Sequence, residues 1–263
     1  RKKIAKILSN YDDLIENNLK RIKLIEESAR LTYEEWFIRF KIDGKKLEID
    51  SETGLPFGWS NKKLANICEV SSSKRIFLSD YVENGVPFFR GKEITIKSQN
   101  KAIANEYFIS EEKFNEIDNR FGSPKVNDIL ISAVGTLGSI YLVRESDGAF
   151  YFKDGNLLWL KEFKEDNSLL VYYGLKSEKL QLNILGIAIG SSQKALTIQA
   201  LKLMELTCPD NSVNKRFNDK VRPLVTQIEI LIHQNQLLKE ARDILLPRLM
   251  TGMIDVEDME ISL

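Results

Sequence analysis

A heptad pattern at the start of the chain is the sequence feature that most constrains the fold. Between Ile4 and Ala29, spacings of four and three residues alternate as they do along the seam of a coiled coil. The seam positions are Ile4, Leu8, Tyr11, Ile15, Asn18, Ile22, Ile25 and Ala29. Such a narrow apolar edge is stable only when a second helix covers it. The pattern therefore predicts a long helix with a helical partner.

A second stretch, near the other end of the chain, repeats this spacing. Its seam positions are Phe217, Val221, Leu224, Ile228, Leu231, Asn235, Leu238 and Leu245, and Arg242 interrupts the stripe. We expect the two stretches to form an antiparallel coiled coil, either within one chain or between two. A seam asparagine costs stability but can favour one register and one partner. We expect this role for Asn18 and Asn235, the alternative being tolerated polar residues at splayed positions.

Composition limits what the rest of the chain can be. With 263 residues, of which 43% are hydrophobic, the chain can bury one good core beside an elongated element. Lys+Arg and Asp+Glu each number 38, so net charge does not indicate a nucleic-acid or membrane partner. Two distant cysteines, Cys68 and Cys208, fit a reducing cytoplasm and no zinc site. We therefore expect a cytoplasmic protein without a metal site or a membrane span.

Between the two helices, residues 41–54 are mostly polar and predict a linker. Short mixed patterns follow over residues 55–210. Strands are expected at Ile67–Val70, Ile94–Ile96, Ile129–Ser132, Ile140–Arg144 and Leu157–Leu160, and helices after Ser110, over Ser168–Ile184 and after Thr197. Because strands and helices do not alternate regularly, we predict a compact mixed α+β domain. The expected plan is helix 1–40, linker 41–54, mixed domain 55–210, helix 211–250 and acidic tail 251–263.

The chain shows little sign of catalytic chemistry. Val134–Ser139 reads VGTLGS and lacks the third glycine of a dinucleotide-binding fingerprint. His233 is the only histidine and falls off the helical seam, so we expect it to face solvent. Asp154, Glu162 and Lys164 can be arranged as a metal-dependent nuclease triplet, but such short charged motifs arise by chance. We therefore predict no catalytic site.

Five loops instead combine cationic, hydroxyl and amide side chains with glycine. Such side chains contact phosphates and base edges of nucleic acids. The candidates are Ser73, Lys74 and Arg75; Arg90 and Lys92; Thr136; Lys153 and Asn156; and Ser191, Ser192, Gln193 and Lys194. For each loop taken alone, the alternative is a turn with solvated charges. This alternative is strongest for Gly135–Ser139, whose glycines are sufficient for the turn.

The order of several motifs resembles one known family. These are LPFGW, VPFFRGKEI, DILISAVGTLGSIYLV, FKDGNLLWL, GSSQKALTIQALK and LKEARDILLPRLMTGMID, and the opening helix is similar to the family's central helix. Together they resemble the specificity subunit of type I restriction-modification systems. That resemblance implies target-recognition domains that each read half of a split double-stranded DNA site, on helices that dock methyltransferase subunits and, through them, a restriction subunit.

The resemblance also implies a non-catalytic chain without a cofactor of its own, since S-adenosylmethionine would bind the methyltransferase subunit. Only one recognition domain is present here, as in a C-terminal half or a half-size subunit, and half-units could self-associate. The rival interpretations are a metal-dependent nuclease and a coiled-coil scaffold without base readout.

The length of the first helix suggests a physical role. At about 1.5 Å per residue, Ile4 to Ala29 spans roughly 38 Å, close to the 34–36 Å of one DNA turn. We therefore expect the coiled coil to set the spacing between half-sites. Residues 55–210 contain 19 Lys+Arg and 19 Asp+Glu, so phosphate attraction is small. We expect weak DNA binding by this chain alone, with partner subunits supplying affinity.

Overall fold

The computed structural model describes residues 2–101, 103, 107–190 and 194–254. It divides into two compact units, one of residues 1–28 and 223–263 and one of residues 29–222. Two long helices, α1 (Lys2–Tyr33) and α8 (Asn211–Met250), contribute residues to both units. Within the described residues, no helix is long and apolar enough to cross a membrane.

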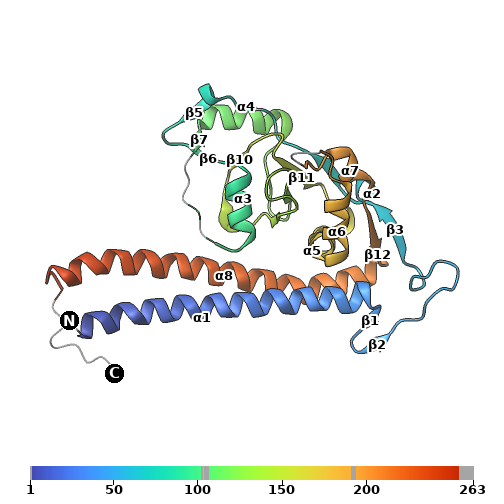
Figure 1. Cartoon of the computed structure of the whole chain (residues 1–263), viewed down its shortest axis with the longest axis horizontal. Coiled ribbons are helices and arrows are strands. Elements are labelled where there is room, and N and C mark those ends of the chain that lie inside the picture. Colours follow the sequence, from blue (N-terminus) through green and yellow to red (C-terminus); the bar gives the residue numbers. More distant parts are fainter. Residues whose placement is uncertain (1, 102, 104–106, 191–193, 255–263) are drawn as a thin grey trace. The chain divides into compact units, whose positions relative to one another are not determined.

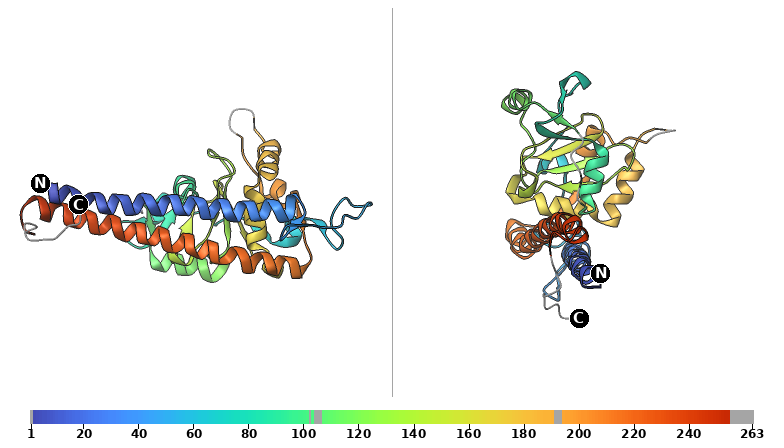
Figure 2. Two further views of the ribbon diagram at one scale, coloured as in Figure 1. Left: turned by 90° about the horizontal axis from the view of Figure 1, so that it is seen from below. Right: turned by 90° about the vertical axis from the view of Figure 1, so that its left-hand side faces the viewer.

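The first unit is an antiparallel pair of helices from one chain (Figure 1). Ile22 of α1 packs with Ile228 and Leu231 of α8, and all three side chains are buried. Both views of Figure 2 show the two helices of this unit side by side. The predicted coiled coil is therefore confirmed, and its pairing lies within the chain.

The two seam asparagines face each other in this unit. The Asn18 Nδ2 donates a hydrogen bond of 3.0 Å to the Asn235 Oδ1, and both residues are buried. The Asn235 Nδ2 in turn donates to the Ile15 carbonyl oxygen at 3.5 Å. Arg242, which interrupts the seam, donates to the Asp12 carboxylate at 2.6 Å. An amide pair of this kind is satisfied only when the two positions lie opposite each other, so it disfavours slipped registers.

The second unit is built on two four-stranded sheets. The first has the order β4 (Glu69–Ser71), β11 (Leu157–Lys161), β8 (Ile129–Ser132) and β9 (Ile140–Leu142), all antiparallel. The second has the order β10 (Tyr151–Phe152), β6 (Val86–Phe89), β7 (Phe108–Ile109) and β5 (Tyr81–Val82), with β10 parallel to β6. Two-stranded pairs join β12 (Glu205–Cys208) to β3 (Ser60–Lys63) and β1 (Lys41–Ile42) to β2 (Lys45–Lys46).

Helices and short turns complete the second unit. The helices are α2 (Leu64–Ile67), α3 (Gly91–Ser98), α4 (Glu111–Phe121), α5 (Ser168–Lys176), α6 (Glu178–Ile187) and α7 (Ile198–Leu203). A π-helical turn, η1 (Glu34–Ile38), follows α1, and 3-10 turns lie at η2 (Leu78–Asp80), η3 (Glu145–Asp147) and η4 (Lys164–Asp166). This mixture confirms the predicted α+β class with flanking long helices.

The parallel pair of β6 and β10 separates two hydrophobic cores. Successive side chains of a strand point to opposite faces. Phe89 and Phe152 accordingly enter one core, with Ile94 and Trp159 among its members. Phe88 and Tyr151 enter the other core, with the α4 residues Phe114 and Ile117. Two adjacent aromatic pairs therefore hold both cores against a single pair of strands.

Three of the predicted strands are confirmed, and all three are buried. Ile129–Ser132 is found as predicted, and the strands expected at Ile140–Arg144 and Leu157–Leu160 differ only at their ends. The strand predicted at Ile94–Ile96 is wrong, because these residues lie in α3. Their β-branched side chains favour a strand, but Glu93 accepts a hydrogen bond from the Arg90 backbone N–H and caps a helix there. Ile67 ends α2, so the strand expected at Ile67–Val70 begins only at Glu69.

Serine and threonine caps set several helix boundaries. Ser110 and Thr197 accept hydrogen bonds from the backbone N–H groups of Lys113 and Ala200, as expected for N-caps. The single helix predicted over Ser168–Ile184 is instead two helices. Ser177 has an extended backbone and caps α6, which ends α5 at Lys176. The residues 41–54 expected to form a linker include the β1–β2 hairpin.

Glycine at position 174 is required by close packing. A Cβ built there would lie 2.5 Å from the Leu206 Cδ1 and 2.9 Å from the Tyr33 Oη, both of which belong to buried side chains. We predict that Gly174→Ala lowers the free energy of unfolding by about 1–3 kcal/mol. Gly186→Ala, in α6 with nothing within 4 Å, should be neutral or stabilise by up to about 1 kcal/mol. Urea unfolding measures both, and equal stabilities would contradict this packing.

The asparagine pair leads to a second prediction. Replacing Asn18 alone by Leu leaves the buried Asn235 amide without this partner, which should cost about 1–3 kcal/mol. Replacing both asparagines by Leu removes the unsatisfied amide, so the double variant should be more stable than either single variant. Unfolding of the four proteins in urea gives the coupling energy. Two losses that simply add would show that the pair has no energetic coupling.

Candidate nucleic-acid interface

Three of the predicted loops meet around one pocket in the second unit. The pocket has a volume of about 490 Å³, and Arg90, Lys92, Thr136 and Asn156 lie in its lining. These residues are separated by up to 66 positions in the chain. The Ala133 N–H donates a hydrogen bond of 2.8 Å to the Asn156 carbonyl oxygen and holds two of the loops together. Cationic, hydroxyl and amide groups are thus gathered at one place.

Strand pairing explains why these loops converge. Leu157, the first residue of β11, pairs with Ser132, the last residue of β8, so the loops beyond them lie at the same sheet edge. Phe89 and Phe152 are paired at the carboxyl ends of the parallel strands β6 and β10. Residues that follow parallel neighbours emerge together. The Lys153 N–H accordingly donates to the Phe89 carbonyl oxygen at 2.9 Å.

Arg90 is held tightly within the protein. Its guanidinium donates to the Glu93 carboxylate at 2.9 and 3.3 Å and lies 4.0 Å from the centre of the Tyr107 ring. The hydrogen bond to Glu93 raises the pKa of Arg90. Burial alone would raise the pKa of Glu93, but hydrogen bonds from the Arg90 side chain and backbone outweigh it and lower the pKa. Arg90 is therefore a preorganised cation whose charge Glu93 offsets.

Two further polar residues line the pocket that sequence reasoning missed, Thr95 of α3 and Ser132 at the end of β8. Lys92 is exposed in the first turn of α3, and Thr95 lies about one turn later in the pocket lining. The Thr95 Oγ1 is buried without a hydrogen-bond partner among the described residues. Ser132 also lines the pocket and donates to the Val134 carbonyl oxygen. Thr95 was missed because residues 94–96 were predicted to form a strand. Ser132 could have been found from the sequence, because it is a polar residue at the end of an apolar strand.

The hairpin between β8 and β9 presents Thr136. Thr136 is exposed, and its carbonyl oxygen accepts a hydrogen bond of 3.0 Å from the Ser139 hydroxyl. Gly135 and Gly138 have φ values of 72° and 78°, a region that glycine enters without strain. The turn itself therefore explains the two glycines, and it places Thr136 in the lining of the pocket.

The first predicted loop lies against the fourth. The Ser72 hydroxyl donates to the Leu157 carbonyl oxygen, and the Lys74 N–H donates to the Tyr151 hydroxyl, both at 2.8 Å. Arg75 is exposed and pairs with Asp154 at 3.0 Å. Lys74 Nζ lies 4.5 Å from the centre of the Phe121 ring, and the Ser73 Oγ is buried without a partner among the described residues.

The fifth loop is described only in part. Ser191, Ser192 and Gln193 lie outside the described residues, while Lys194 is exposed. Ile189 and Ala195 form a β-bridge at the base of this loop. The Leu196 N–H donates to the Ala133 carbonyl oxygen at 2.9 Å, which places the base of the loop beside the end of β8.

The described residues offer groups for binding rather than for catalysis. Burial raises the pKa of the Cys68 thiol to about 12 and that of the Cys208 thiol to about 11, so both stay protonated at neutral pH. His233 is exposed on α8, as predicted. Within the same residues, no group of three or more His, Cys, Asp and Glu side chains is placed to hold a metal ion.

Comparison with known families identifies the class. Residues 56–240 match the model of the type I restriction modification DNA specificity domain, and the chain belongs to this family. The resemblance read from the sequence motifs is thereby confirmed. The family is a specificity domain, in agreement with the prediction of a non-catalytic specificity chain.

Named relatives agree with this family. The chain is 28% identical to the type I restriction enzyme MjaIX specificity subunit of Methanocaldococcus jannaschii, over 98% of this chain and 59% of the relative. It is 23% identical to the MjaVIII specificity subunit of the same organism, over 98% of this chain and 61% of the relative. The chain thus spans about three fifths of the length of these relatives.

Solved structures show the same fold. The S subunit of a type I restriction-modification system from M. genitalium matches with a TM-score of 0.63 and 17% identity, over 94% of this chain and 59% of that one. The HsdS subunit from Thermoanaerobacter tengcongensis matches with a TM-score of 0.51 and 17% identity, over 94% of this chain and 56% of that one. The mixed domain flanked by long helices is therefore an established architecture.

Proposed function

We propose that this chain is a DNA-recognition element of a type I restriction-modification complex and reads one half of a bipartite target. The observation that carries this proposal is the convergence of three predicted loops on one pocket in a chain of the DNA specificity family. Lysine contacts phosphate or guanine, asparagine pairs with adenine, and threonine reaches either base or phosphate. Lys92, Asn156 and Thr136 supply these three groups.

The second part of the proposal concerns half-site spacing. The paired helices carry a buried hydrogen bond between Asn18 and Asn235, which disfavours other registers. Ile4 to Ala29 covers roughly 38 Å of helix, comparable to one turn of DNA at 34–36 Å. A helix pair with a single register would hold two reading domains at a constant separation along the duplex.

The partners belong to the proposal as well. Leu14 and Leu237 are about half exposed, at 51% and 50%, and line a groove of about 550 Å³ on the helical unit with Leu238. Exposed apolar grooves of this kind mark protein-binding surfaces. We propose that methyltransferase subunits dock on the helices and carry S-adenosylmethionine. A restriction subunit would associate through them, half-units could self-associate, and the complex would act in the cytoplasm.

Charge balance explains the need for partners. The 55–210 region has equal numbers of acidic and basic residues, and Arg90 and Arg75 are each paired with a carboxylate. Phosphate contacts from this chain alone are therefore few, although they usually supply much of the affinity for DNA. In this proposal, this chain reads the bases, and its partners enclose the duplex and supply most of the affinity.

The nuclease alternative finds no support in the described residues. Asp154, which that mechanism needs as a metal ligand, is partly buried and paired with the exposed Arg75. A carboxylate that is already paired with a guanidinium is poorly suited to bind a metal cation, because its oxygens already accept charge-assisted hydrogen bonds. The scaffold alternative makes one different prediction. If the chain is only a scaffold, substitutions of the pocket residues would not change the sequence preference of the complex.

Substitutions in the pocket test this proposal. Asn156→Ala should relax base preference at one half-site by roughly 5- to 100-fold, the worth of a specific base contact. Lys92→Ala should weaken binding to all sequences alike and reduce its salt dependence. The readout is methylation of an oligonucleotide panel by the complete methyltransferase.

Lys45→Ala serves as the matched control, because Lys45 is an exposed lysine of the β1–β2 hairpin outside the pocket lining. It should leave both properties unchanged. Wild-type base preference in Asn156→Ala, together with wild-type affinity and salt dependence in Lys92→Ala, would favour a scaffold over a DNA reader.

A further inference from the structure

A strained turn lies directly after the central strand β11. Glu165 and Asp166 of η4 have φ values of 53° and 52°, and Glu162 just before them has a φ of 53°. Residues with a Cβ adopt this left-handed region only at a cost in energy, and consecutive examples persist only when the surroundings hold them. Something outside the turn must therefore stabilise this conformation.

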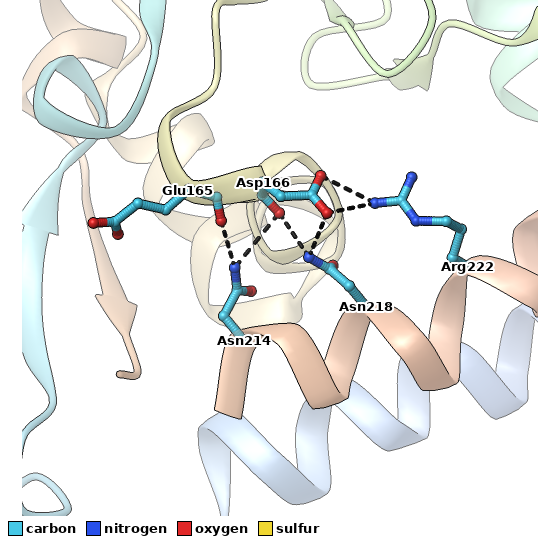
Figure 3. A network of polar contacts seen from close by, with 5 residues as sticks. All are labelled: Glu165, Asp166, Asn214, Asn218 and Arg222. Carbon is cyan, nitrogen blue, oxygen red and sulfur yellow. Dashed lines mark hydrogen bonds and ion pairs between the residues drawn. The ribbon is translucent and has the colours of Figure 1, made fainter. Parts of the chain in front are cut away.

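Helix α8 supplies the hydrogen bonds that hold the turn (Figure 3). The Asn214 Nδ2 donates to the Glu165 carbonyl oxygen at 2.9 Å, and the Asn218 Nδ2 donates to the Asp166 carbonyl oxygen at 2.8 Å. One turn farther along, Arg222 donates to both carboxylate oxygens of Asp166, at 3.0 and 2.7 Å. Residues four apart share one helix face, so these three form a continuous polar stripe. We call them the α8 clamp.

Stability alone does not explain the two asparagines. Asn214 and Asn218 are only 3% and 4% exposed, and the Oδ1 atom of each is buried without a hydrogen-bond partner among the described residues. An unsatisfied buried carbonyl destabilises the folded state, and an apolar side chain of similar shape would avoid that cost. The Nδ2 groups, however, donate directional hydrogen bonds and so fix the position of the turn backbone. A buried side chain that costs stability but fixes the position of its partner is typical of a contact that determines specific geometry.

The clamp is connected to the reading pocket through a single strand. The turn follows β11, and the first residue of β11 follows Asn156 directly. β11 is the central strand between β4 and β8, and β8 ends at the pocket residue Ser132. A close-packed interior has low compressibility, so a displacement of one paired strand is transmitted to its neighbours. The position of the turn on α8 therefore determines where the pocket lies relative to the first turns of that helix.

We propose that Asn214, Asn218 and Arg222 are positioning residues that restrict the complex to one spacer length between half-sites. They act through the turn at 164–166 and β11 and make no contact with DNA. This inference rests on the proposed function, because a spacer exists only if the target is bipartite. It predicts that loosening the clamp changes which spacers are accepted and leaves the bases that are read unchanged.

The test uses the double variant Asn214→Leu with Asn218→Leu in the complete methyltransferase. Leucine has the same branched shape and suits a buried site, but it donates no hydrogen bond. Oligonucleotides carry the wild-type target with its natural spacer or with one base pair added or removed. Methylation of the targets with altered spacers, relative to the target with the natural spacer, should rise roughly fivefold. This is the effect expected from the loss of about one net hydrogen bond.

Arg222→Ala provides a second variant that does not disturb a buried site, since its ion pair with Asp166 is largely exposed. It should act in the same direction but less strongly. Lys220→Ala is the control, an exposed residue of the same helix that should leave spacer preference unchanged. Thermal unfolding and base preference at the natural spacer are measured for every variant.

The outcomes separate the two proposals. An unchanged ratio between altered and natural spacers in both clamp variants would overturn the positioning role. So would an equal loss of methylation on all spacers, or a change in the bases that are read. A wild-type target that is not bipartite would instead contradict the proposed function.

Discussion

The structure of the second unit depends on aromatic packing around Phe217. This fully buried ring lies 4.9 Å from the ring of Phe37 and 6.2 Å from that of Tyr33, and Tyr173 of α5 packs on it at 6.3 Å. Buried aromatic rings contribute large apolar areas and prefer such edge-on geometries. Because Phe217 belongs to α8, Tyr33 to α1 and Phe37 to η1, one cluster joins both long helices to the mixed domain.

The position of the loops that line the pocket follows from how the cores are divided. Two cores share the β6–β10 pair, so the loops after these strands and the ends of β8 and β11 are held by packing on both sides. Arg90 is fixed by Glu93 and Tyr107 before any ligand arrives. Preorganisation of this kind lowers the entropy lost on binding. Under the proposed function, such a neutral domain would discriminate bases while contributing little general attraction for DNA.

Sequence patterns predicted the features that depend on local periodicity. The helical seam, the caps at Ser110 and Thr197 and the buried strand Ile129–Ser132 all follow from such patterns. Residue type alone singled out the loops that line the pocket, but their convergence depends on strand pairing across the chain. The α8 clamp was not predictable, because Asn214 meets Glu165 across 49 positions and a left-handed turn leaves no periodic signal. α3 was missed because tertiary burial of Ile94 and a Glu93 cap overrode β-branched propensity.

Exchange of the recognition domain tests the central claim most directly. Residues 55–210 would be replaced by the corresponding segment of a related specificity subunit, and methylated sites would be mapped in cells carrying the complete system. The account predicts a bipartite motif in which the half-site read by this domain changes, while the spacer length stays the same. A motif that does not change after the exchange, or that loses its spacer while keeping both half-sites, would contradict it.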